Sequence, residues 1–348
     1  MKTIIKIEIV LLVLALLVGA GMVLVSEGYL ELLYDPVVVE AKPVPIATDG
    51  AVEPLSMEEP EAAEDPETTV PTQETVPEDA SQEETKKEET RKLTAKKYFA
   101  YDIREGTYLM KKGKGSDKLY PASITKLLTA YVVLQHMKPG DTVEVGDAMK
   151  LVAWDSSVAG LKEGDKVTVE QLVAAMMLPS GNDAAQTAAV ATGRAIAGKN
   201  IGYQEAVDVF MKEMNKQAKA IGMKNSHFVS PDGYHHDQHY TTMDDLVALC
   251  KKVLTNETIL KYTSRAKDAV ILPDRTLEWK NTNALLHPGN KAYLSNTIGL
   301  KTGFTSKAGN CLVTAFFEPD RIILVGVFGC PARTDDRYLD TVAIYNSI

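Results

Sequence analysis

The hydrophobic pattern divides the chain into an apolar run, a polar segment and a long region of mixed periodicity. Residues 9–25 are 17 consecutive uncharged residues, preceded by Lys2 and Lys6. The run is longer than a usual signal-peptide core and long enough for a short spanning helix. We expect an uncleaved transmembrane anchor over 9–25, with residues 1–8 in the cytoplasm and the rest outside the cell membrane. A cleaved signal segment, giving a secreted protein, is the alternative.

The next segment, residues 26–92, has almost no hydrophobic periodicity. Its stretch from Pro36 to Lys92 contains 16 Asp and Glu against 5 Lys and Arg, mixed with Pro, Thr and Ala. This composition cannot bury enough apolar surface to offset the chain entropy that folding removes. We expect residues 26–92 to form a disordered acidic stalk, and residues 93–348 to form the folded catalytic body.

Short β-branched or apolar runs at both ends of this body predict strands. Two runs surround a turn at Arg104-Glu105-Gly106 and predict a hairpin, and two others are joined at Glu318-Pro319-Asp320. The expected strands cover residues 98–102, 107–110, 299–303, 311–317 and 321–328.

Between these strands the apolar spacing changes to that of helices. Thr168 and Gln171 form a capping-box pattern at one helix start. The expected helices cover residues 123–136, 168–177, 182–196, 203–221 and 242–254, with one more at the C-terminus. Strands at both ends around a helical insertion predict an α+β fold. We expect one antiparallel sheet built from both ends of the domain, flanked by helices, with an all-α subdomain beside it.

Charge and cysteine content narrow the function only slightly. The chain has a net charge of −9, but residues 93–348 carry 27 acidic and 31 basic residues, a net charge of +4 that ordinary soluble surfaces also show. No nucleic-acid partner is expected. The three cysteines, Cys250, Cys311 and Cys330, are too few and too scattered for a disulfide framework or a thiolate metal site. We expect buried free thiols.

A hydroxyl and an amine stand three residues apart in Ser123-x-x-Lys126, on one face of the first predicted helix. Serine needs a base to take its proton, and a lysine whose pKa is lowered by burial can serve. Alone the motif is weak, because Ser264 and Lys267 have the same spacing. Two further elements strengthen it.

The second element, Ser180-Gly-Asn182, lies at a break between two predicted helices and offers a hydroxyl and an amide for proton relay and substrate binding. The third, Lys301-Thr302-Gly303, lies in a predicted strand, where a cation, a hydroxyl and a glycine fit a substrate carboxylate. A helix cap and a basic edge strand are the simpler interpretations of each element alone. The order of all three along one chain is more specific.

With these elements in this order, residues from about Tyr98 to the end resemble the penicillin-recognising serine enzymes. The nearest resemblance is to the low-molecular-mass penicillin-binding proteins, which are serine-type D-alanyl-D-alanine carboxypeptidases. The matching segments are Tyr120-Pro-Ala-Ser-Ile-Thr-Lys126, Ala159-Gly-Leu-Lys-Glu-Gly164, Leu178-Pro-Ser-Gly-Asn-Asp-Ala-Ala185 and Lys301-Thr-Gly-Phe-Thr-Ser-Lys-Ala-Gly309. The penicillin-binding, class A β-lactamase-like fold is implied.

The resemblance also implies a role for each matching residue. Ser123 would be the acylated nucleophile, Lys126 its base, and Ser180 with Asn182 the second catalytic element. Lys301, Thr302 and Gly303 would bind the substrate carboxylate, and the backbone N–H groups of Ser123 and Phe304 would form the oxyanion hole. A basic residue near that carboxylate is also implied, with Arg333 and Arg337 as the candidates.

The implied reaction removes the terminal D-alanine from peptidoglycan pentapeptide stems through a Ser123 ester, and β-lactams would acylate the same serine. No metal and no organic cofactor is implied. The expected partners are the stem peptide, β-lactam inhibitors and the membrane, which the N-terminal segment would anchor, and we expect a monomer. Transpeptidation, in which an amine replaces water, stays open.

A class A β-lactamase is the nearest competing hypothesis. Such enzymes need a glutamate in an E-x-x-x-N loop for deacylation. No glutamate of residues 93–348 has Asn four positions later, and the middle element is Ser-Gly-Asn rather than Ser-Asp-Asn. A peptidase fits better.

Two further hypotheses concern different classes of protein. A metallopeptidase would use the cluster His227, His235, His236, Asp237 and His239, but H-E-x-x-H is missing, and the stretch follows a turn at 230–233, so we expect an exposed loop. A cell-wall binding protein with an inactive site would keep the fold without turnover. Its nucleophile and base would be dispensable, whereas Ser123 and Lys126 are both present.

Overall fold

The computed structural model describes residues 91–332 and 334–348. The expected anchor and all but the last two residues of the expected stalk lie outside the described residues. Within the described ranges no helix combines the length and apolar character needed to span a membrane.

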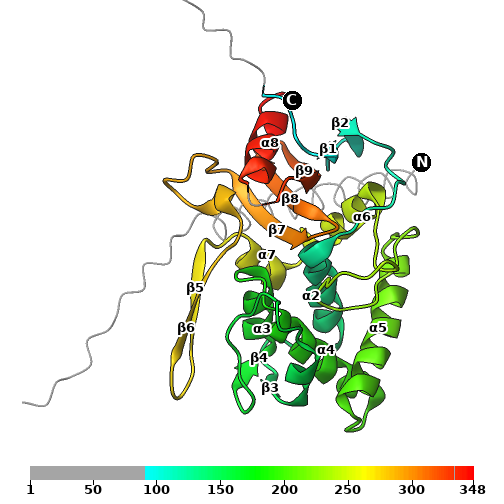
Figure 1. Cartoon of the computed structure of the whole chain (residues 1–348), viewed down its shortest axis with the longest axis vertical. Helices are drawn as coiled ribbons and strands as arrows, with labels where there is room; N and C mark the ends of the chain where they lie inside the picture. Colours follow the sequence, from blue (N-terminus) through cyan, green and yellow to red (C-terminus); the bar gives the residue numbers. More distant parts are fainter. Residues whose placement is uncertain (1–90, 333) are drawn as a thin grey trace, which may run out of the picture. The chain divides into compact units, whose positions relative to one another are not determined.

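Five antiparallel strands form the main sheet, in the order β2-β1-β9-β8-β7 (Figure 1). The pairing of β1 with β9 joins the two ends of the domain, from Lys97 opposite Phe328 to Asp102 opposite Ile323. The strands are β1 (Lys97–Asp102), β2 (Thr107–Lys112), β7 (Thr297–Thr305), β8 (Gly309–Glu318) and β9 (Arg321–Cys330). Both predicted hairpins are confirmed, and β7 forms one edge of the sheet.

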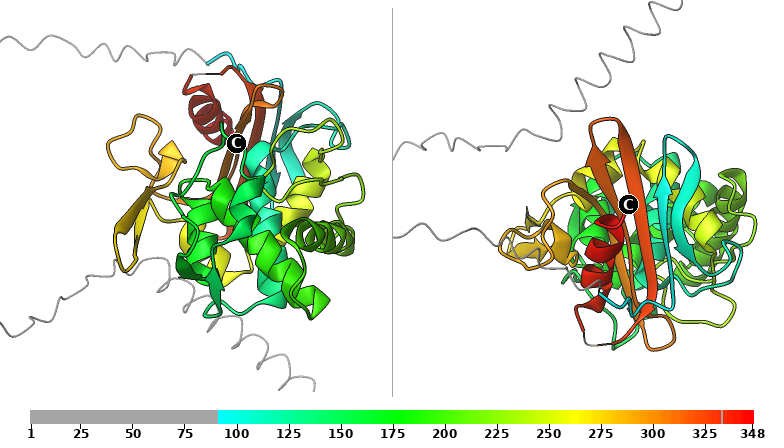
Figure 2. Two further views of the ribbon diagram at one scale, coloured as in Figure 1. Left: turned by 60° about the horizontal axis from the view of Figure 1, so that its bottom comes forward. Right: turned by 90° about the horizontal axis from the view of Figure 1, so that it is seen from above.

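Alternating side chains of the central strands build two cores. Leu312 and Phe316 of β8 pack with Val325 of β9 in the cluster that also contains Tyr338 and Ile344 of α8 (Asp336–Tyr345). Val313 and Ala315 of β8 are also buried and, because side chains alternate along a strand, point to the opposite face. In Figures 1 and 2, α8 covers one face of the sheet and the main group of helices lies beyond the other.

The helical part contains the helices that the pattern predicts, with ends shifted by one or two residues, and one helix over Glu257–Thr263 that it did not predict. Thr168 caps α3 in a full capping box with Gln171. The helices are α2 (Thr125–His136), α3 (Val169–Met177), α4 (Asn182–Ala197), α5 (Tyr203–Ala220), α6 (Met243–Val253) and α7 (Glu257–Thr263). The α+β class is therefore confirmed.

The helical region also contains short elements that the pattern did not predict. It contains two small two-stranded sheets and two short 3-10 helices, and a third 3-10 helix precedes β7. These elements are β3 (Thr142–Glu144) with β4 (Lys166–Thr168), β5 (Lys267–Ile271) with β6 (Thr276–Lys280), η1 (Ala122–Ile124), η2 (Asp147–Leu151) and η3 (Ala284–Leu286). The three cysteines are buried free thiols, as expected.

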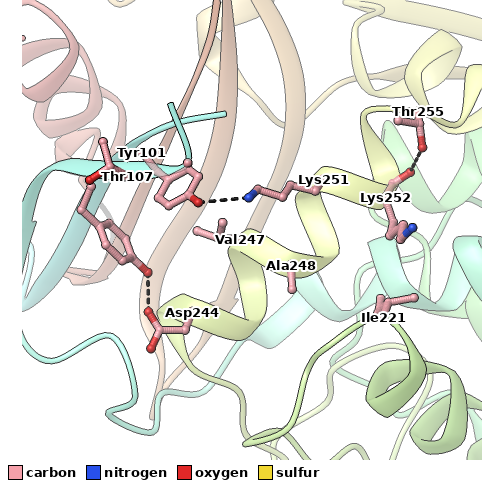
Figure 3. A pocket seen from close by; sticks show the side chains of 11 residues that line it. Tyr101, Thr107, Ile221, Asp244, Val247, Ala248, Lys251, Lys252 and Thr255 are labelled. Carbon is pink, nitrogen blue, oxygen red and sulfur yellow. Dashed lines mark hydrogen bonds between the residues drawn. The ribbon is translucent and has the colours of Figure 1, made fainter. Parts of the chain in front are cut away.

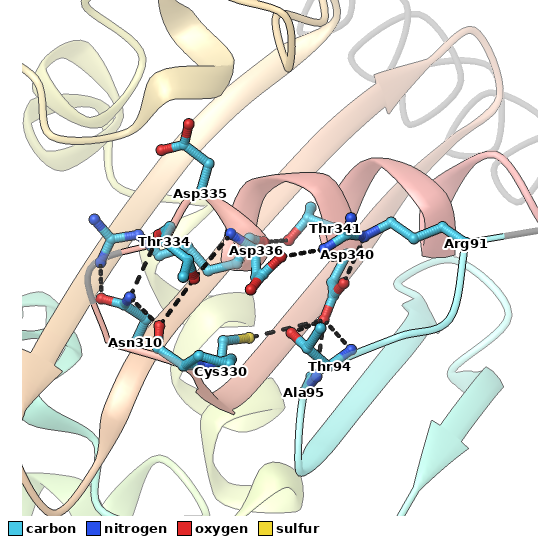
Figure 4. A network of polar contacts seen from close by, with 12 residues as sticks. Arg91, Thr94, Ala95, Asn310, Cys330, Thr334, Asp335, Asp336, Asp340 and Thr341 are labelled. Atoms are coloured by element: carbon cyan, nitrogen blue, oxygen red, sulfur yellow. Dashed lines mark hydrogen bonds and ion pairs between the residues drawn. The ribbon is translucent and has the colours of Figure 1, made fainter.

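A buried carboxylate fastens the start of the described chain to α8 (Figure 4). Asp340 Oδ2 accepts hydrogen bonds from the backbone N–H of Thr94 and Ala95, both at 2.8 Å, and from the Thr94 hydroxyl at 2.9 Å. Asp340 Oδ1 accepts from Arg91 Nε at 2.9 Å. Arg91 also pairs with Asp336, so a residue expected at the end of the stalk is bonded to the folded body.

We expect Asp340→Ala to lower the free energy of unfolding by about 2 to 4 kcal/mol, because it leaves buried backbone donors without an acceptor. Urea denaturation measures the change. The matched control is Asp335→Ala, which removes an exposed carboxylate paired with Lys291 and should stay within about 0.5 kcal/mol of wild type. Equal stabilities for the two variants would contradict this function of Asp340.

Candidate active site

The sequence predicted Ser123 in the first turn of a helix, whereas the structure places it in the 3-10 turn η1, two residues before α2 begins at Thr125. The preceding residue, Ala122, has a left-handed backbone with φ of 49°, which is unusual for a residue with a side chain. Gly233 packs directly against it, since a Cβ on Gly233 would lie 2.0 Å from the Ala122 carbonyl oxygen. Only glycine fits there.

The Lys126 amine is the centre of the polar cluster. Its Nζ lies 2.9 Å from Ser123 Oγ, 2.7 Å from Asn182 Oδ1 and 2.8 Å from the Asp232 carbonyl oxygen. The predicted contact between Ser123 and Lys126 is present because residues three apart share a helix face. The Lys126 side chain is fully buried, and this desolvation lowers its pKa from 10.5 to about 8, against the opposing effect of Asp232 and Asp183.

Asn182 and Ser180 come from the turn between α3 and α4. Ser180 is buried, and its backbone has a left-handed conformation with φ of 65°. The Ser180 hydroxyl forms no hydrogen bond with Ser123 or Lys126 in the described part of the chain. Of Ser180 and Asn182, only Asn182 is hydrogen-bonded to Lys126. The Asn182 amide nitrogen donates to Ser156 Oγ at 2.9 Å.

The buried carboxylate of Asp183 binds the backbone of residues 159–161, next to the segment that carries Ser156. Asp183 accepts hydrogen bonds from the backbone N–H of Ala159, Gly160 and Leu161, at 2.8 to 3.0 Å. The indole of Trp279, on β6, donates to the Ala159 carbonyl at 2.8 Å. The segment that carries Ser156 is thus tied both to α4 and to the β5–β6 hairpin.

Edge strand β7 places the third element beside Ser123. A Cβ on Gly303 would lie 2.9 Å from the Pro121 carbonyl oxygen and 3.2 Å from the Ser123 backbone nitrogen, so a larger residue would push β7 away from η1. Thr302 is buried, and its hydroxyl lies 2.6 Å from the Thr282 hydroxyl. Phe304 follows on the same strand with half of its side chain exposed.

Lys301 is a buried cation without an anionic partner among the described residues. Its Nζ donates to the Thr302 carbonyl at 3.2 Å, and its side chain is 1% exposed. Burial lowers its pKa well below the usual value, and the nearby charges of Lys126 and Arg337 lower it further. A bound carboxylate would supply the missing counter-charge.

Arg337, on α8, faces the same region. Its Nη1 donates to Asn310 Oδ1 at 3.1 Å and lies 3.5 Å from the Gly303 carbonyl oxygen. Asn310 in turn donates to the Pro331 carbonyl at 2.6 Å. The other candidate, Arg333, lies outside the described residues.

The histidine cluster was expected to lie in an exposed loop. That expectation was wrong for His239, which is buried. His239 is 2% exposed, and its Nε2 lies 2.8 Å from the Thr125 hydroxyl. Its Nδ1 accepts from the Val229 backbone at 3.3 Å, and burial lowers its pKa to about 4. In the described part of the chain, no group of three or more His, Cys, Asp and Glu is placed to hold a metal ion.

A cavity of about 600 Å³ lies between the β1–β2 hairpin and α6 (Figure 3). Tyr101 and Lys251 are bonded at 3.0 Å across it, and Tyr108 donates to Asp244 at 2.6 Å. None of the Ser123, Lys126 or Lys301 side chains lines this cavity.

Several residues of the site have no signal in the local sequence. The Asp232 carbonyl, Ser156 and Asn310 reach the site through contacts between segments 20 or more positions apart. Asp183 follows Asn182 directly, yet nothing in the sequence reveals that it binds three backbone N–H groups. A list of motifs cannot identify such neighbours.

Comparison with known proteins agrees with the motifs. A relative from Streptomyces sp. strain K15, named D-alanyl-D-alanine carboxypeptidase, is 34% identical and aligns with 66% of this chain and 83% of its own. The carboxypeptidases DacF of Bacillus subtilis and DacA of Escherichia coli K12 are 29% and 32% identical, over 62% and 68% of this chain. The chain spans only about half of their lengths, 52% and 56%.

Solved structures give the same fold. The Streptomyces K15 DD-transpeptidase is 30% identical with a TM-score of 0.66 and covers 74% of this chain and 97% of its own. Penicillin-binding protein D2 from Listeria monocytogenes, in an ampicillin-bound form, is 26% identical with a TM-score of 0.59, over 73% and 97%. The model of the peptidase S11 family, described as D-alanyl-D-alanine carboxypeptidase, matches residues 82–331. The resemblance drawn from the motifs is confirmed, and the chain belongs to the peptidase S11 family of D-alanyl-D-alanine carboxypeptidases.

Proposed function

We propose that this protein is a serine DD-carboxypeptidase that removes the terminal D-alanine from peptidoglycan pentapeptide stems through an acyl-enzyme on Ser123. The observation that carries the proposal is the 2.9 Å contact between the Ser123 hydroxyl and the buried Lys126 amine, whose pKa is about 8. A base with a pKa near the working pH suits proton transfer from a serine.

The hydrogen bonds around Lys126 support its role as the base. A neutral amine has two hydrogens and one lone pair. Asn182 Oδ1 and the Asp232 carbonyl can only accept, so they take the two hydrogens. The lone pair is left for the Ser123 hydroxyl, which donates its proton as its oxygen attacks the substrate carbonyl.

The second element and the oxyanion hole complete the acyl transfer. Asn182 orients Lys126, and Ser180 lies in the same buried turn, where it would pass the proton to the leaving D-alanine. The Ser123 and Phe304 backbone N–H groups would stabilise the tetrahedral oxyanion. The close approach of β7 to η1 at Gly303 supports this pairing, because it brings the two segments together.

The carboxylate of the leaving D-alanine would bind at the cationic end of the site. Arg337 supplies positive charge and Thr302 supplies a hydroxyl, and a bound carboxylate would favour the ammonium form of Lys301 against the effect of burial. Gly303 lets the substrate backbone lie close to the strand. Of the two arginine candidates we choose Arg337, which lies 3.5 Å from the Gly303 carbonyl oxygen.

The expected surroundings of the enzyme follow from the same proposal. β-Lactams would acylate Ser123 in place of the stem peptide, and the ampicillin-bound relative supports this. We place the catalytic body outside the cell membrane, as a monomer tethered by residues 9–25. A second candidate function is DD-transpeptidation, which the name of the solved Streptomyces K15 protein supports.

Benzylpenicillin should form a persistent covalent adduct with the wild-type chain, and D-alanine should be released from a pentapeptide. The reason is that Ser123 Oγ opens either carbonyl by the same attack. Intact-mass analysis measures the adduct, and an amino-acid assay measures D-alanine. Ser123→Ala should show neither, whereas Ser264→Ala, in the other S-x-x-K sequence, should keep both. Rapid penicillin turnover would favour a β-lactamase, and neither product would favour an inactive binding protein.

The acylation rate should rise with pH and level off above about pH 8, because only neutral Lys126 can take the proton. The neutral fraction of Lys126 falls about tenfold for each pH unit below that pKa. His239, with a pKa of about 4, stays neutral across pH 6 to 9.5 and cannot produce this profile. Stopped-flow acylation by benzylpenicillin over that range gives the curve.

Asn182→Asp provides the matched test of this assignment. A carboxylate at this position would stabilise the ammonium form of Lys126 and move the rise to higher pH. A rate that is flat from pH 6 to 9.5 in wild type would contradict Lys126 as the base.

Arg337→Ala should lower kcat/KM for the pentapeptide by about 10-fold to 100-fold, mainly through KM, because it removes a charged hydrogen-bond donor to the carboxylate. Asn310→Ala should cause a smaller loss, since it only frees the arginine. The matched control is Arg104→Ala, whose side chain is exposed on the β1–β2 turn and should leave the kinetics unchanged. A larger loss in Arg333→Ala than in Arg337→Ala would reverse the choice of arginine.

A further inference from the structure

The two acceptors of the Lys126 amine come from different parts of the fold. Asn182 is the first residue of α4, whereas Asp232 lies in a turn of the connection between α5 and α6. The two hydrogen bonds orient the amine only while these acceptors keep their spacing. The geometry at Lys126 therefore depends on how α4 is held against the Asp232 turn.

Gln186 joins α4 to the Asp232 turn. It lies one helical turn after Asn182, so the two side chains share a face of α4. Gln186 Nε2 donates to Asp232 Oδ2 at 3.0 Å, across 46 positions of sequence. Both side chains are buried, with exposed fractions of 5% and 2%. Hydrogen bonds thus connect Lys126, α4 and the Asp232 turn in a closed cycle.

The Asp232 carboxylate is held at both of its oxygens. Oδ1 accepts from the Tyr234 backbone N–H at 2.9 Å, which closes a turn of the kind that Asp side chains stabilise. Oδ2 accepts from Gln186, the only side chain that donates to this carboxylate in the described part of the chain. Loss of the Gln186 donor would leave a buried carboxylate oxygen unpaired and free the turn to move.

The orientation of the Gln186 amide follows from this contact. A carboxylate can only accept, so the amide nitrogen must face Asp232. The other end of the amide, Gln186 Oε1, is buried and has no hydrogen-bond partner among the described residues. A buried acceptor without a partner is unfavourable. The polar end of this side chain therefore contributes through one contact, the hydrogen bond to Asp232.

We propose that Gln186 is a positioning residue for the base: by holding Asp232 it fixes the spacing between the two acceptors of Lys126. This inference rests on the proposed function. Gln186 forms no hydrogen bond with Ser123 or Lys126 in the described ranges, so it acts through Asp232. When the acceptor moves, the Lys126 lone pair turns away from Ser123 Oγ, which slows acylation without weakening the binding that precedes it.

Stopped-flow acylation by benzylpenicillin on the full-length chain tests the proposal, because the dependence on penicillin concentration separates binding from acylation. Gln186→Met keeps the length of the side chain and removes the donor. It should lower the saturated acylation rate above pH 8 about tenfold, since a displaced catalytic group loses rate steeply with distance. The dissociation constant of the complex that precedes acylation should stay within about twofold of wild type.

The hydrogen bond can also be restored with its direction reversed. Gln186→Glu alone sets two carboxylates against each other and should lower the rate at least as much as Gln186→Met. With Asp232→Asn added, the new carboxylate accepts from the new amide, whose oxygen still accepts from the Tyr234 N–H. The double variant should recover a rate within about threefold of wild type. A packing role of position 186 would not produce this rescue.

Asp232→Asn alone separates geometry from charge. Its amide can donate to Gln186 Oε1 once the Gln186 amide turns over, so the saturated rate above pH 8 should be retained. Lys126 is near the carboxylates of Asp232 and Asp183, which favour its ammonium form, and near the amine of Lys301. Removing the Asp232 charge should therefore move the rise of the acylation rate to lower pH.

Gln217→Met is the matched control. Gln217 Nε2 also donates to a carboxylate, that of Glu213 on the same helix α5, at 2.7 Å, and its loss should leave the acylation rate unchanged. Intact-mass analysis after long incubation verifies folding, because each folded variant should reach one adduct per chain.

Two results would refute the positioning role and leave the proposed function standing. One is an adduct on wild type with Gln186→Met acylating at the same rate. The other is a double variant that is no faster than Gln186→Glu. If wild type forms no adduct and releases no D-alanine, the proposed function fails and this inference fails with it.

Discussion

Burial of the Lys126 amine beside Ser123 is the constraint on which the rest of the site depends. Lowering its pKa from 10.5 to about 8 costs the folded state roughly 3 kcal/mol below pH 8, relative to an exposed lysine, and this cost disappears as pH rises towards 10.5. The fold must also provide acceptors for a buried donor. It takes them from two distant turns, at Asn182 and Asp232, so these turns can move little without losing their hydrogen bonds to Lys126.

Strand β7 of the main sheet also constrains the position of Ser123. Edge strand β7 approaches η1 so closely at Gly303 that no Cβ fits without movement, and Gly233 does the same against Ala122. Between these contacts Ser123 sits in a strained turn that neither local propensity nor helix formation would produce. Placing Lys301 on β7 then adds a second buried lysine near the first, and the charge of Lys126 disfavours protonation of Lys301. A carboxylate bound at this position would offset that repulsion.

The sequence predicted the contacts between residues that lie close together in the chain. The Ser123–Lys126 contact, the capping box at Thr168 and the hairpin of β8 with β9 all involve residues within about twenty positions of each other. It did not predict the β5–β6 hairpin, although Pro273 and Asp274 form a turn signal there. Nor could it place His239 in the interior, because burial of that histidine depends on packing against Phe228 and on the Thr125 hydroxyl. Such contacts join segments whose distance only the folded chain determines.

The difference between motif residues and residues outside the motifs also bears on the step that follows acylation in the proposed reaction. In the proposed mechanism the motif residues make the acyl-enzyme whichever nucleophile follows, so they do not separate hydrolysis from transpeptidation. Any distinction must come from segments outside the motifs, such as those of Asp155 and Tyr234, which a hydrogen bond joins beside the partners of Lys126.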